Sequence, residues 1–456
     1  MKPLLTGPIL PSLLRLALPN VLAMAAAAAI GIGETFYVGL LGLEPLAAMA
    51  IVFPFVMLTQ MFSSGAMGGG VSSAVSRAIG ARDLDRARVL ATHAVVIGAS
   101  AGLLFTALFL LGGPVLYRWL GARAGVLEQA VLYSQVVFCG ALPIWLCNTL
   151  ISILRGAGNM RIPSASIMFA CVVQIGLGAG LGLGLGPLPR LGMVGVALGQ
   201  VIAYSLIMAF LLWFLIAGPA PVRLSLRGGT LRSEMFNDIL KVGALACLSP
   251  LQTVLVILIV TALVARYGVQ PLAGYGIGAR LEFLLVPIAF GVGVAAVPMV
   301  GMAIGAGDVP RARRIAWIAG AVSAGVLGSI GLFVTVLPDA WAGLFTSDAQ
   351  VLASARQYLR WVGPAFALFG LGMTLYFASQ GAGRVAGPVL AASARLAFVV
   401  VVGAMLVWWG APVWALFAMV GAAMTVYGLV TAGAVYFTEW DAANRAAASS
   451  ATRQRA

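Results

Sequence analysis

Residues 78–88 read AIGARDLDRAR, and residues 303–313 read AIGAGDVPRAR. Eight of these eleven positions are identical, at an offset of 225 residues. Two further blocks keep nearly the same register. At 225, Gly156, Ala157, Gly158 and Pro163 match Gly381, Ala382, Gly383 and Pro388, and at 226, Gly42, Pro45, Leu46 and Ala47 match Gly268, Pro271, Leu272 and Ala273. Chance does not align three such blocks, so the chain is an internal duplication.

Composition places this duplicated chain in a membrane. Of its 456 residues, 62% are hydrophobic and 9% are charged, whereas a soluble domain carries about 25% charged residues. A bilayer-spanning helix needs about 20 apolar residues, and runs of that kind recur along the chain. They predict twelve spans, at 14–40, 46–76, 89–116, 125–154, 163–187, 191–217, 237–266, 270–302, 312–337, 349–379, 386–410 and 412–438. The runs do not alternate with period two as in a β-barrel, so we predict an all-α integral membrane protein.

The duplication divides these spans into two sets of six. An even number of spans gives both halves the same orientation, which is the parallel repeat plan of some transporters, with a binding site between the halves. The predicted parts are an N-terminal lobe, a cytoplasmic linker, a C-terminal lobe and a cytoplasmic tail, at 10–217, 218–236, 237–438 and 439–456.

The net charge of +14 could suggest nucleic acid, but its distribution indicates membrane topology instead. Basic residues gather after the even-numbered spans and in the tail: Arg77, Arg82, Arg86, Arg88, Arg155, Arg161, Arg223, Arg227, Arg232, Lys241, Arg311, Arg313, Arg314, Arg384, Arg445, Arg453 and Arg455. This is the positive-inside pattern. We expect a bacterial inner-membrane protein with both termini in the cytoplasm and no nucleic-acid partner. The first apolar run continues to about Leu40, which is too long for a signal peptide.

Enzyme and ATPase signatures do not occur in the sequence. Lys2 and Lys241 do not close a GxxxxGK[ST] phosphate loop, and His93, the single histidine, has no metal-ligand motif beside it. The four cysteines all lie inside predicted spans and are interpreted as apolar fillers. We therefore expect a transporter that uses neither ATP nor a metal or other cofactor.

Two acidic residues lie deep inside predicted spans, Glu34 and Glu282. Such residues are functional candidates because a charge at the bilayer centre costs at least about 2.5–3.5 kcal/mol. The repeat counterpart of Glu34 is about Val260, so the duplicated architecture does not require this acid. Burial disfavours the anion, and a carboxyl here can bind and release a proton. The alternative is a packed Glu34 hydrogen-bonded to a neighbouring helix.

Three other features have both a structural and a functional interpretation. Arg280 and Glu282 point to different faces of one helix, so they either stabilise neighbouring helices or contact substrate or ion. Pro19 should kink or end the first span, either as a helix-start proline or as a bend linked to Glu34. The repeated sets Asp83/Arg86/Arg88 and Asp308/Arg311/Arg313 either fix loop shape or take part in gating.

The sequence resembles the multidrug and toxic compound extrusion (MATE) family across about residues 10–438. The matching stretches are LALPN at 16–20, GETFYVGLLGLEPLAAMAIVFP at 33–54, SRAIGARDLDRA at 76–87, LRGAGNMRIP at 154–163 with its echo at 379–388, GIGARLEFLLVP at 276–287 and GMAIGAGDVPRARR at 301–314. The resemblance implies two six-helix lobes in a V, alternating access, and export of cationic amphiphilic compounds driven by H⁺ or Na⁺.

The resemblance also implies roles for individual residues. Glu34 stands where the family usually has a first-span Asp, and Pro19 matches the family's first-span proline. The chain looks closer to the DinF-like branch than to the NorM-like branch. The Asn and Asp that the DinF-like branch carries on the fifth span match Gln174 and Gly178 here, so the second carboxylate is missing. The sixth-span Thr of that branch matches Gln200.

The NorM-like branch is matched less well. Where it has a seventh-span Glu, this chain has Gln252 and Thr253, and its tenth-span Asp has no equivalent. Na⁺ needs several oxygen ligands, whereas a proton needs one acid, so these departures favour proton coupling. We predict that Glu34 is the coupling residue and that Tyr37, Gln174 and Gln200 shape its pocket.

The sequence thus predicts a monomeric proton-coupled exporter of cationic amphiphiles. A Na⁺-coupled drug antiporter remains an alternative. A lipid or lipid-linked oligosaccharide flippase remains another, although its anionic cargo calls for more mid-span cations than Arg280 and Arg395. A receptor or scaffold is disfavoured because it has no need of duplicated lobes.

Overall fold

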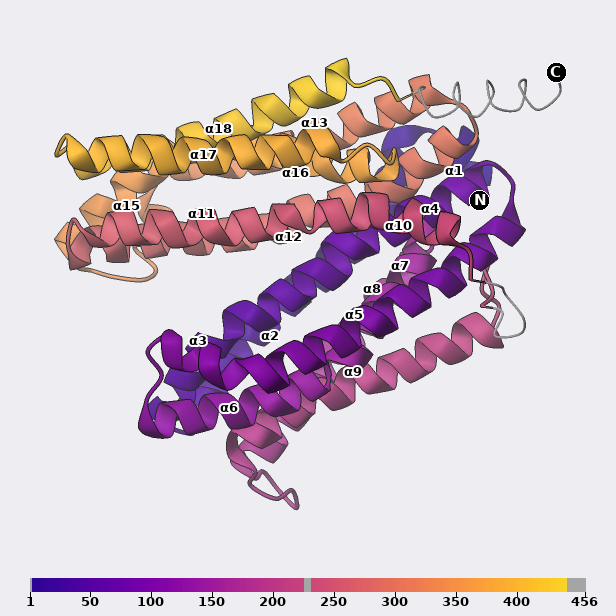
Figure 1. The fold of residues 1–456 in the computed structure, drawn as a ribbon. Helices are drawn as coiled ribbons and strands as arrows, with labels where there is room; N and C mark the ends of the chain where they lie inside the picture. The colour runs from indigo at the N-terminus through magenta and orange to yellow at the C-terminus, as the bar shows by residue number, and fades with distance from the viewer. Residues whose placement is uncertain (1, 225–230, 441–456) are drawn as a thin grey trace. The chain divides into compact units, whose positions relative to one another are not determined.

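The computed structural model describes residues 2–224 and 231–440, and every regular element in these two stretches is a helix (Figure 1). Eleven helices in this part of the chain are long and apolar enough to cross a membrane. A bent pair, Ala124–Cys139 with Ala141–Gly156, makes the number twelve if it is counted as one span. The predicted all-α membrane protein of about twelve spans is confirmed.

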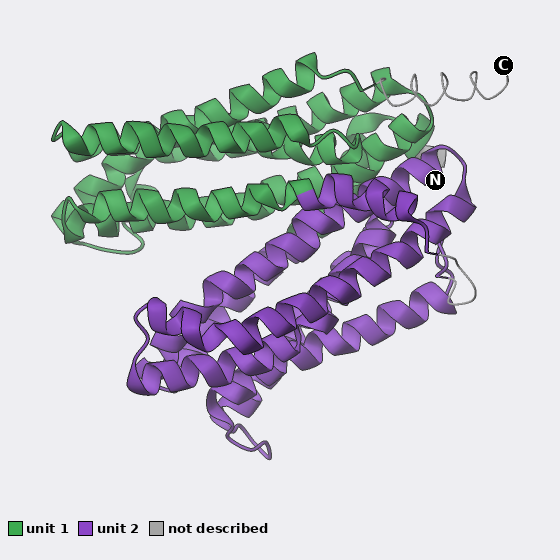
Figure 2. Cartoon of the chain, viewed as in Figure 1, with its two compact units in different colours: residues 1–21, 245–456 green, residues 22–244 purple. Residues whose placement is uncertain are grey.

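The chain divides into two compact units, shown in separate colours in Figure 2. Unit 1 comprises residues 1–21 and 245–456, and unit 2 comprises residues 22–244. The chain therefore passes from one unit to the other twice, near Val21 and near Ala244. The predicted lobes at 10–217 and 237–438 remain a prediction. Parts of the predicted linker and tail, at 225–230 and 441–456, lie outside the described residues.

Unit 2 contains the helices of the first half. They are α2 (Ile9–Gly39, whose first residues belong to unit 1), α3 (Leu43–Gln60), the π-helix η1 (Met61–Met67), α4 (Gly68–Gly80), α5 (Leu84–Trp119), α6 (Ala124–Cys139), α7 (Ala141–Gly156), α8 (Arg161–Leu183), α9 (Gly192–Ile216) and most of α10 (Ser233–Ala246).

Unit 1 contains the short N-terminal helix and the helices of the second half. They are α1 (Lys2–Thr6), α11 (Leu248–Ala265), α12 (Val269–Gly305), α13 (Val309–Val336), α14 (Asp339–Ala342), α15 (Ala349–Val362), the 3₁₀ turn η2 (Gly363–Ala365), α16 (Phe366–Gly381), α17 (Ala386–Trp408) and α18 (Val413–Phe437).

The repeated Gly-Ala-Gly blocks end equivalent helices in the same way. Gly158 and Gly383 have φ of 78° and 72°, the left-handed conformation that glycine adopts at helix C-termini without strain. The first glycine of each block permits close packing. A Cβ on Gly156 would lie 2.8 Å from the carbonyl oxygen of Ser72, and one on Gly381 would lie 2.5 Å from that of Val297. Ser72 and Val297 are themselves 225 residues apart, so both units use one helix contact.

Each unit has its own apolar core, and its outer surface is apolar as well. In unit 2, Phe109 of α5 stacks on Phe138 of α6 with ring centroids 3.9 Å apart. In unit 1, Tyr358 of α15 packs edge-on against Phe417 of α18 at 5.2 Å. Large apolar side chains such as Leu111 remain exposed on the helices, as expected where lipid replaces water.

Candidate functional site

Glu34 forms the most deeply buried acidic site in the described part of unit 2. It lies on α2 and is only 5% exposed, and Gln174 on α8 is 4% exposed. The Gln174 Nε2 donates a hydrogen bond of 2.7 Å to Glu34 Oε1. The structure thus brings together two residues that are 140 positions apart in the chain. A buried carboxyl is stabilised only when its oxygens are paired in this way.

Tyr37 lies one turn beyond Glu34 on the same helix, is buried, and places its hydroxyl beside the Glu34 carboxyl. The same hydroxyl lies against Gly178 of α8, where an added Cβ would be 2.6 Å away. Tyr37 therefore fills the space at Gly178, the position that the resemblance associates with a second carboxylate. Tyr133 of α6, which sequence reasoning missed, is also buried and close enough to interact electrostatically with Glu34.

Gln200 is buried on α9, next to a close contact between α8 and α9. The neighbouring Gly199 has no room for a Cβ, which would lie 2.5 Å from the backbone nitrogen of Gly178. This contact sets the separation of the two helices near Glu34. The hydrogen bond to Glu34 comes from Gln174, and Gln200 is placed near the site by its helix and its burial.

Pro19 lies inside α2, and the helix continues through it without ending. The expectation that a helix ends at this proline is therefore not met. The next residue explains how α2 is held here, because Asn20 Nδ2 donates a hydrogen bond of 3.2 Å to the carbonyl oxygen of Gly291 on α12. Pro19 and Asn20 lie just before Val21, where α2 leaves unit 1.

Glu282 occupies a separate position in unit 1, on α12. Its carboxyl accepts a hydrogen bond from the hydroxyl of Tyr358 on α15. Arg280, two residues earlier, is exposed and lies over the ring of Phe345, 5.2 Å from its centroid. The two charged residues therefore face different partners, as their spacing on the helix predicts.

Arg395 on α17 is a buried cation in the interior of unit 1. Its guanidinium lies over two aromatic rings, 5.6 Å from the centroid of Phe369 and 6.0 Å from that of Tyr427. Such rings attract cations through their negative faces. Glu282 is close enough to interact electrostatically with Arg395, although the sequence placed the two residues 113 positions apart.

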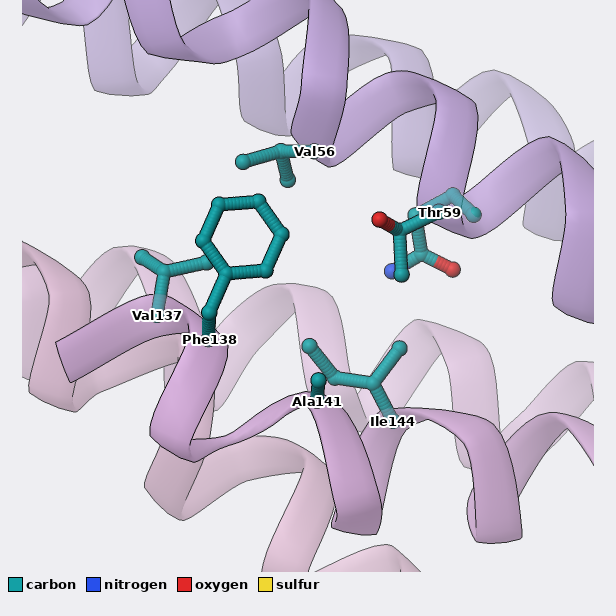
Figure 3. Close-up of a pocket in the computed structure, with 7 residues that line it drawn as sticks. Val56, Thr59, Val137, Phe138, Ala141 and Ile144 are labelled. Atoms are coloured by element: carbon teal, nitrogen blue, oxygen red, sulfur yellow. The ribbon is translucent and has the colours of Figure 1, made fainter. Parts of the chain in front are cut away.

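A polar network crosses unit 2 where α3 continues into the π-helix η1. Gln60 Nε2 donates to the Tyr204 hydroxyl at 2.7 Å, and Asn148 Nδ2 donates to Gln60 Oε1 at 2.9 Å and to Ser63 Oγ at 2.8 Å. Figure 3 shows the narrow crevice beside this network. It has about 190 Å³ of space between side chains and is lined by Val56, Thr59, Gln60, Val137, Phe138, Ala141 and Ile144. Sequence reasoning missed this network, although π-helices often mark functional sites.

The geometry around Glu34 suits proton exchange. The carboxyl has one fixed donor, the amide of Gln174, and an adjacent hydroxyl, that of Tyr37. An amide and a hydroxyl can each pair with an ionised or a protonated carboxyl, because an amide carries both donor and acceptor atoms and a hydroxyl can rotate. The site can therefore hold Glu34 in either protonation state without moving a helix.

Comparison with known proteins adds a family match. The MatE family model matches residues 19–179 and 246–428. A protein of Shewanella oneidensis named FAD transporter is 26% identical over 386 residues, covering 82% of each chain. The Multidrug export protein MepA of Staphylococcus aureus is 23% identical over 407 residues, covering 86% of each.

Solved structures have the same fold. One, described as a MOP superfamily transporter from Pyrococcus furiosus with a binding pocket of reverse polarity, superposes with a TM-score of 0.86 at 24% identity, covering 94% of this chain and 95% of that chain. Another, the outward-facing conformation of a multidrug resistance MATE family transporter, gives a TM-score of 0.82 at 24% identity, covering 95% of this chain and 98% of that chain.

Proposed function

This chain belongs to the MatE family of membrane transporters, and we propose that it exports cationic amphiphilic small molecules in exchange for protons. It is a transporter and not an enzyme. The observation that carries the proposal is the buried carboxyl of Glu34 and its hydrogen bond from Gln174. In a bilayer, such an acid is retained where its charge is used.

The donor set around Glu34 favours a proton as the coupling ion. Gln174 presents its N–H group to the carboxyl, and an N–H donor cannot ligate a cation. The space at Gly178 is taken by the Tyr37 hydroxyl rather than by a second carboxylate. Hard cations are bound through several oxygen ligands, whereas a proton needs one carboxyl oxygen.

The proposed cycle uses the charge of Glu34 alternately for substrate and proton. Ionised Glu34 attracts a cationic substrate from the cytoplasm. In the outward-open state a proton neutralises Glu34, and the substrate leaves because that attraction is lost. The protonated transporter then turns inward and releases the proton to the more alkaline cytoplasm. Each 100 mV of membrane potential supplies about 2.3 kcal/mol per charge moved.

The surroundings of this cycle are part of the proposal. The distribution of arginines supports a bacterial inner-membrane location with both termini in the cytoplasm. The repeat supports two six-helix lobes at 10–217 and 237–438. We propose that the transporter acts as a monomer, that it needs no cofactor, and that it is closer to the DinF-like branch than to the NorM-like branch of its family.

Proteoliposomes with an imposed pH gradient provide the test. A cationic fluorescent dye should be transported when a pH gradient is present, whether or not Na⁺ is added. An uncoupler should stop transport. If transport persists with the uncoupler and stops when Na⁺ is withdrawn, the coupling ion is Na⁺ and the proposal is wrong.

A second candidate function is export of an anionic compound such as a flavin nucleotide. The relative from Shewanella oneidensis is named FAD transporter, and the buried Arg395 of unit 1 could pair with an anionic group. The same proteoliposomes loaded with FAD distinguish the two candidates. Export of FAD that is lost in Arg395→Gln but kept in Arg280→Gln, an exposed arginine, would favour the second candidate.

A further inference from the structure

The repeated sequence blocks place an arginine in the same position at the start of two equivalent helices. Asp83 caps α5 by accepting a hydrogen bond of 2.8 Å from the backbone N–H of Arg86. Asp308 caps α13 by accepting one of 3.0 Å from the backbone N–H of Arg311. In each case the aspartate satisfies a free N–H of the first helical turn. The arginine side chains are left to bind other segments.

In unit 2, the side chain of Arg86 binds the helix α10. Its Nη2 donates to Asp238 Oδ2 at 2.5 Å and lies 3.6 Å from Glu234 Oε1. Both acids are in the first turns of α10. One guanidinium can serve two carboxylates because its N–H groups spread in a fixed plane. Arg86 therefore holds the start of α10 against the start of α5.

Two turns further along α5, His93 binds the same segment. Its Nε2 accepts a hydrogen bond of 2.9 Å from the backbone N–H of Arg232, directly before α10. Its Nδ1 lies 2.8 Å from the carbonyl oxygen of Val89, so Nδ1 carries the proton. The ring of Phe236 packs edge-on against the imidazole with centroids 4.7 Å apart. Residues 232–238 are thus anchored at two levels of one helix face.

In unit 1, the side chain of Arg311 binds the N-terminal segment. Its Nη2 donates to the carbonyl oxygens of Gly7 and Leu4, at 2.6 and 3.3 Å. These carbonyls lie at and just after the end of α1, where helix carbonyls have no partner within the helix. A cation at this end is stabilised by the helix dipole. Arg311 therefore holds α1 against the start of α13.

The two held segments share a position in the connectivity of the chain. The segment held by Arg311 leads into α2, which passes from unit 1 to unit 2 near Val21. The segment held by Arg86 is α10, from which the chain passes back to unit 1 near Ala244. Each arginine thus fixes the lead-in to one of the two crossings, and it does so from the unit that the chain is about to leave.

We propose that Arg86 and Arg311 are repeat-related positioning residues that anchor the two lead-in segments during transport. The proposal rests on the proposed transport function, because alternating access requires the units to move while the crossings stay connected. The two anchors differ in chemistry. Arg86 is held by carboxylates, so its anchor can be reversed by charge exchange. Arg311 is held by backbone carbonyls, so its anchor depends on the guanidinium alone.

The neighbouring arginines provide matched controls. Arg88 pairs with Asp85 of its own helix at 3.0 Å and is two residues from Arg86. Arg314 is exposed and three residues from Arg311. Replacing either control by glutamine removes one cytoplasmic positive charge, as replacing Arg86 or Arg311 does. A general effect of charge on topology or lipid binding would therefore appear in all four variants.

Amide hydrogen exchange on the full-length protein in lipid nanodiscs tests the anchoring without any transport assay. Arg86→Gln should speed exchange in Ser233–Ala246 by about fivefold or more, a measure of local opening, and leave residues 2–8 unchanged. Arg311→Gln should have the opposite pattern. Arg88→Gln and Arg314→Gln should change neither segment. Unchanged exchange of α10 in Arg86→Gln, or equal changes in the controls, would overturn the proposal.

Transport kinetics then test the positioning role. Arg86→Gln and Arg311→Gln should lower the maximal rate about threefold or more with little change in KM, because conformational steps set many transport and turnover rates. The charge exchange Arg86→Asp with Asp238→Arg should restore most of the rate that Arg86→Asp loses. Folded variants that show normal maximal rates, or an exchange pair without rescue, contradict the role in transport. Absence of dye transport by the wild type would instead count against the proposed function.

Discussion

The hydroxyl of Tyr37 occupies the space above Gly178, where a Cβ would lie 2.6 Å from the phenolic oxygen. This relationship joins α2 to α8 next to the carboxyl of Glu34. It also explains how the site accommodates a glycine at a position where the resemblance implies an acid. The size of residue 178 and the orientation of Tyr37 are therefore coupled.

We predict that Gly178→Ala displaces Tyr37 and lowers both stability and transport. Overpacking of this kind costs about 1–3 kcal/mol, which thermal unfolding of the purified protein would measure. Gly176 is the matched control, because it lies on the same helix and a Cβ there meets nothing within 4 Å. Tyr37→Phe combined with Gly178→Ala should recover part of the lost stability. Equal melting temperatures for the 176 and 178 variants would contradict the contact.

We predict that Glu34→Gln abolishes proton-coupled export while the protein still folds. The amide mimics the neutral carboxyl, so it can no longer exchange a proton or attract a cation. Glu34→Asp should keep partial activity because it shortens the arm but retains the charge. The measurement is dye transport under a pH gradient, with melting temperature as the folding check. If Glu34→Gln transports at the wild-type rate and Glu282→Gln is inactive, coupling belongs to Glu282.

We predict that His93→Ile destabilises the protein by about 1–2 kcal/mol. Isoleucine is the residue at the repeat counterpart, Ile318, and it fills similar space without a hydrogen-bond acceptor. The N–H of Arg232 would lose its partner, and a buried donor left unpaired costs about 1–3 kcal/mol. His93→Gln should be milder because its carbonyl can accept this bond. Thermal unfolding of both variants decides, and equal losses would argue against the bond to Arg232.

We predict that Gly156→Ala and Gly381→Ala are each strongly destabilising and similar in size. Both added methyl groups would meet a backbone carbonyl, that of Ser72 or of Val297, within 2.8 Å. Backbone cannot move aside as a flexible side chain can, so a loss of about 2 kcal/mol or more is expected. Gly325→Ala is the control, since its Cβ meets nothing within 4 Å. A large loss at only one of the two repeat positions would show that the units pack differently there.

Much of the architecture could be predicted because its signals are local. Each span is a continuous apolar run, and Glu34 stands out because an acid inside such a run is costly. The bend of 44° between α6 and α7 and the π-helix η1 could not be predicted, since neither interrupts the apolar composition.

The partners of the polar residues were harder to predict. Gln174 was reached through the family resemblance, and the structure adds its hydrogen bond to Glu34. Tyr133 gave no signal, because a tyrosine near a span end is ordinary in sequence. Asp238 is 152 residues from Arg86, and no rule of spacing joins them. Contacts of this range depend on tertiary packing rather than on helix periodicity.

The two crossings of the chain have a consequence for fragments of this protein. A gene cut at the duplication point would produce two polypeptides, neither of which corresponds to a compact unit. The first would carry residues 2–21, which belong to unit 1, and the second would carry α10, whose acids belong beside Arg86. Halves expressed separately would each lack one anchored piece, whereas halves expressed together could complement one another by exchanging these pieces. The ancestor of such a duplication, present as two copies, would have paired by the same exchange.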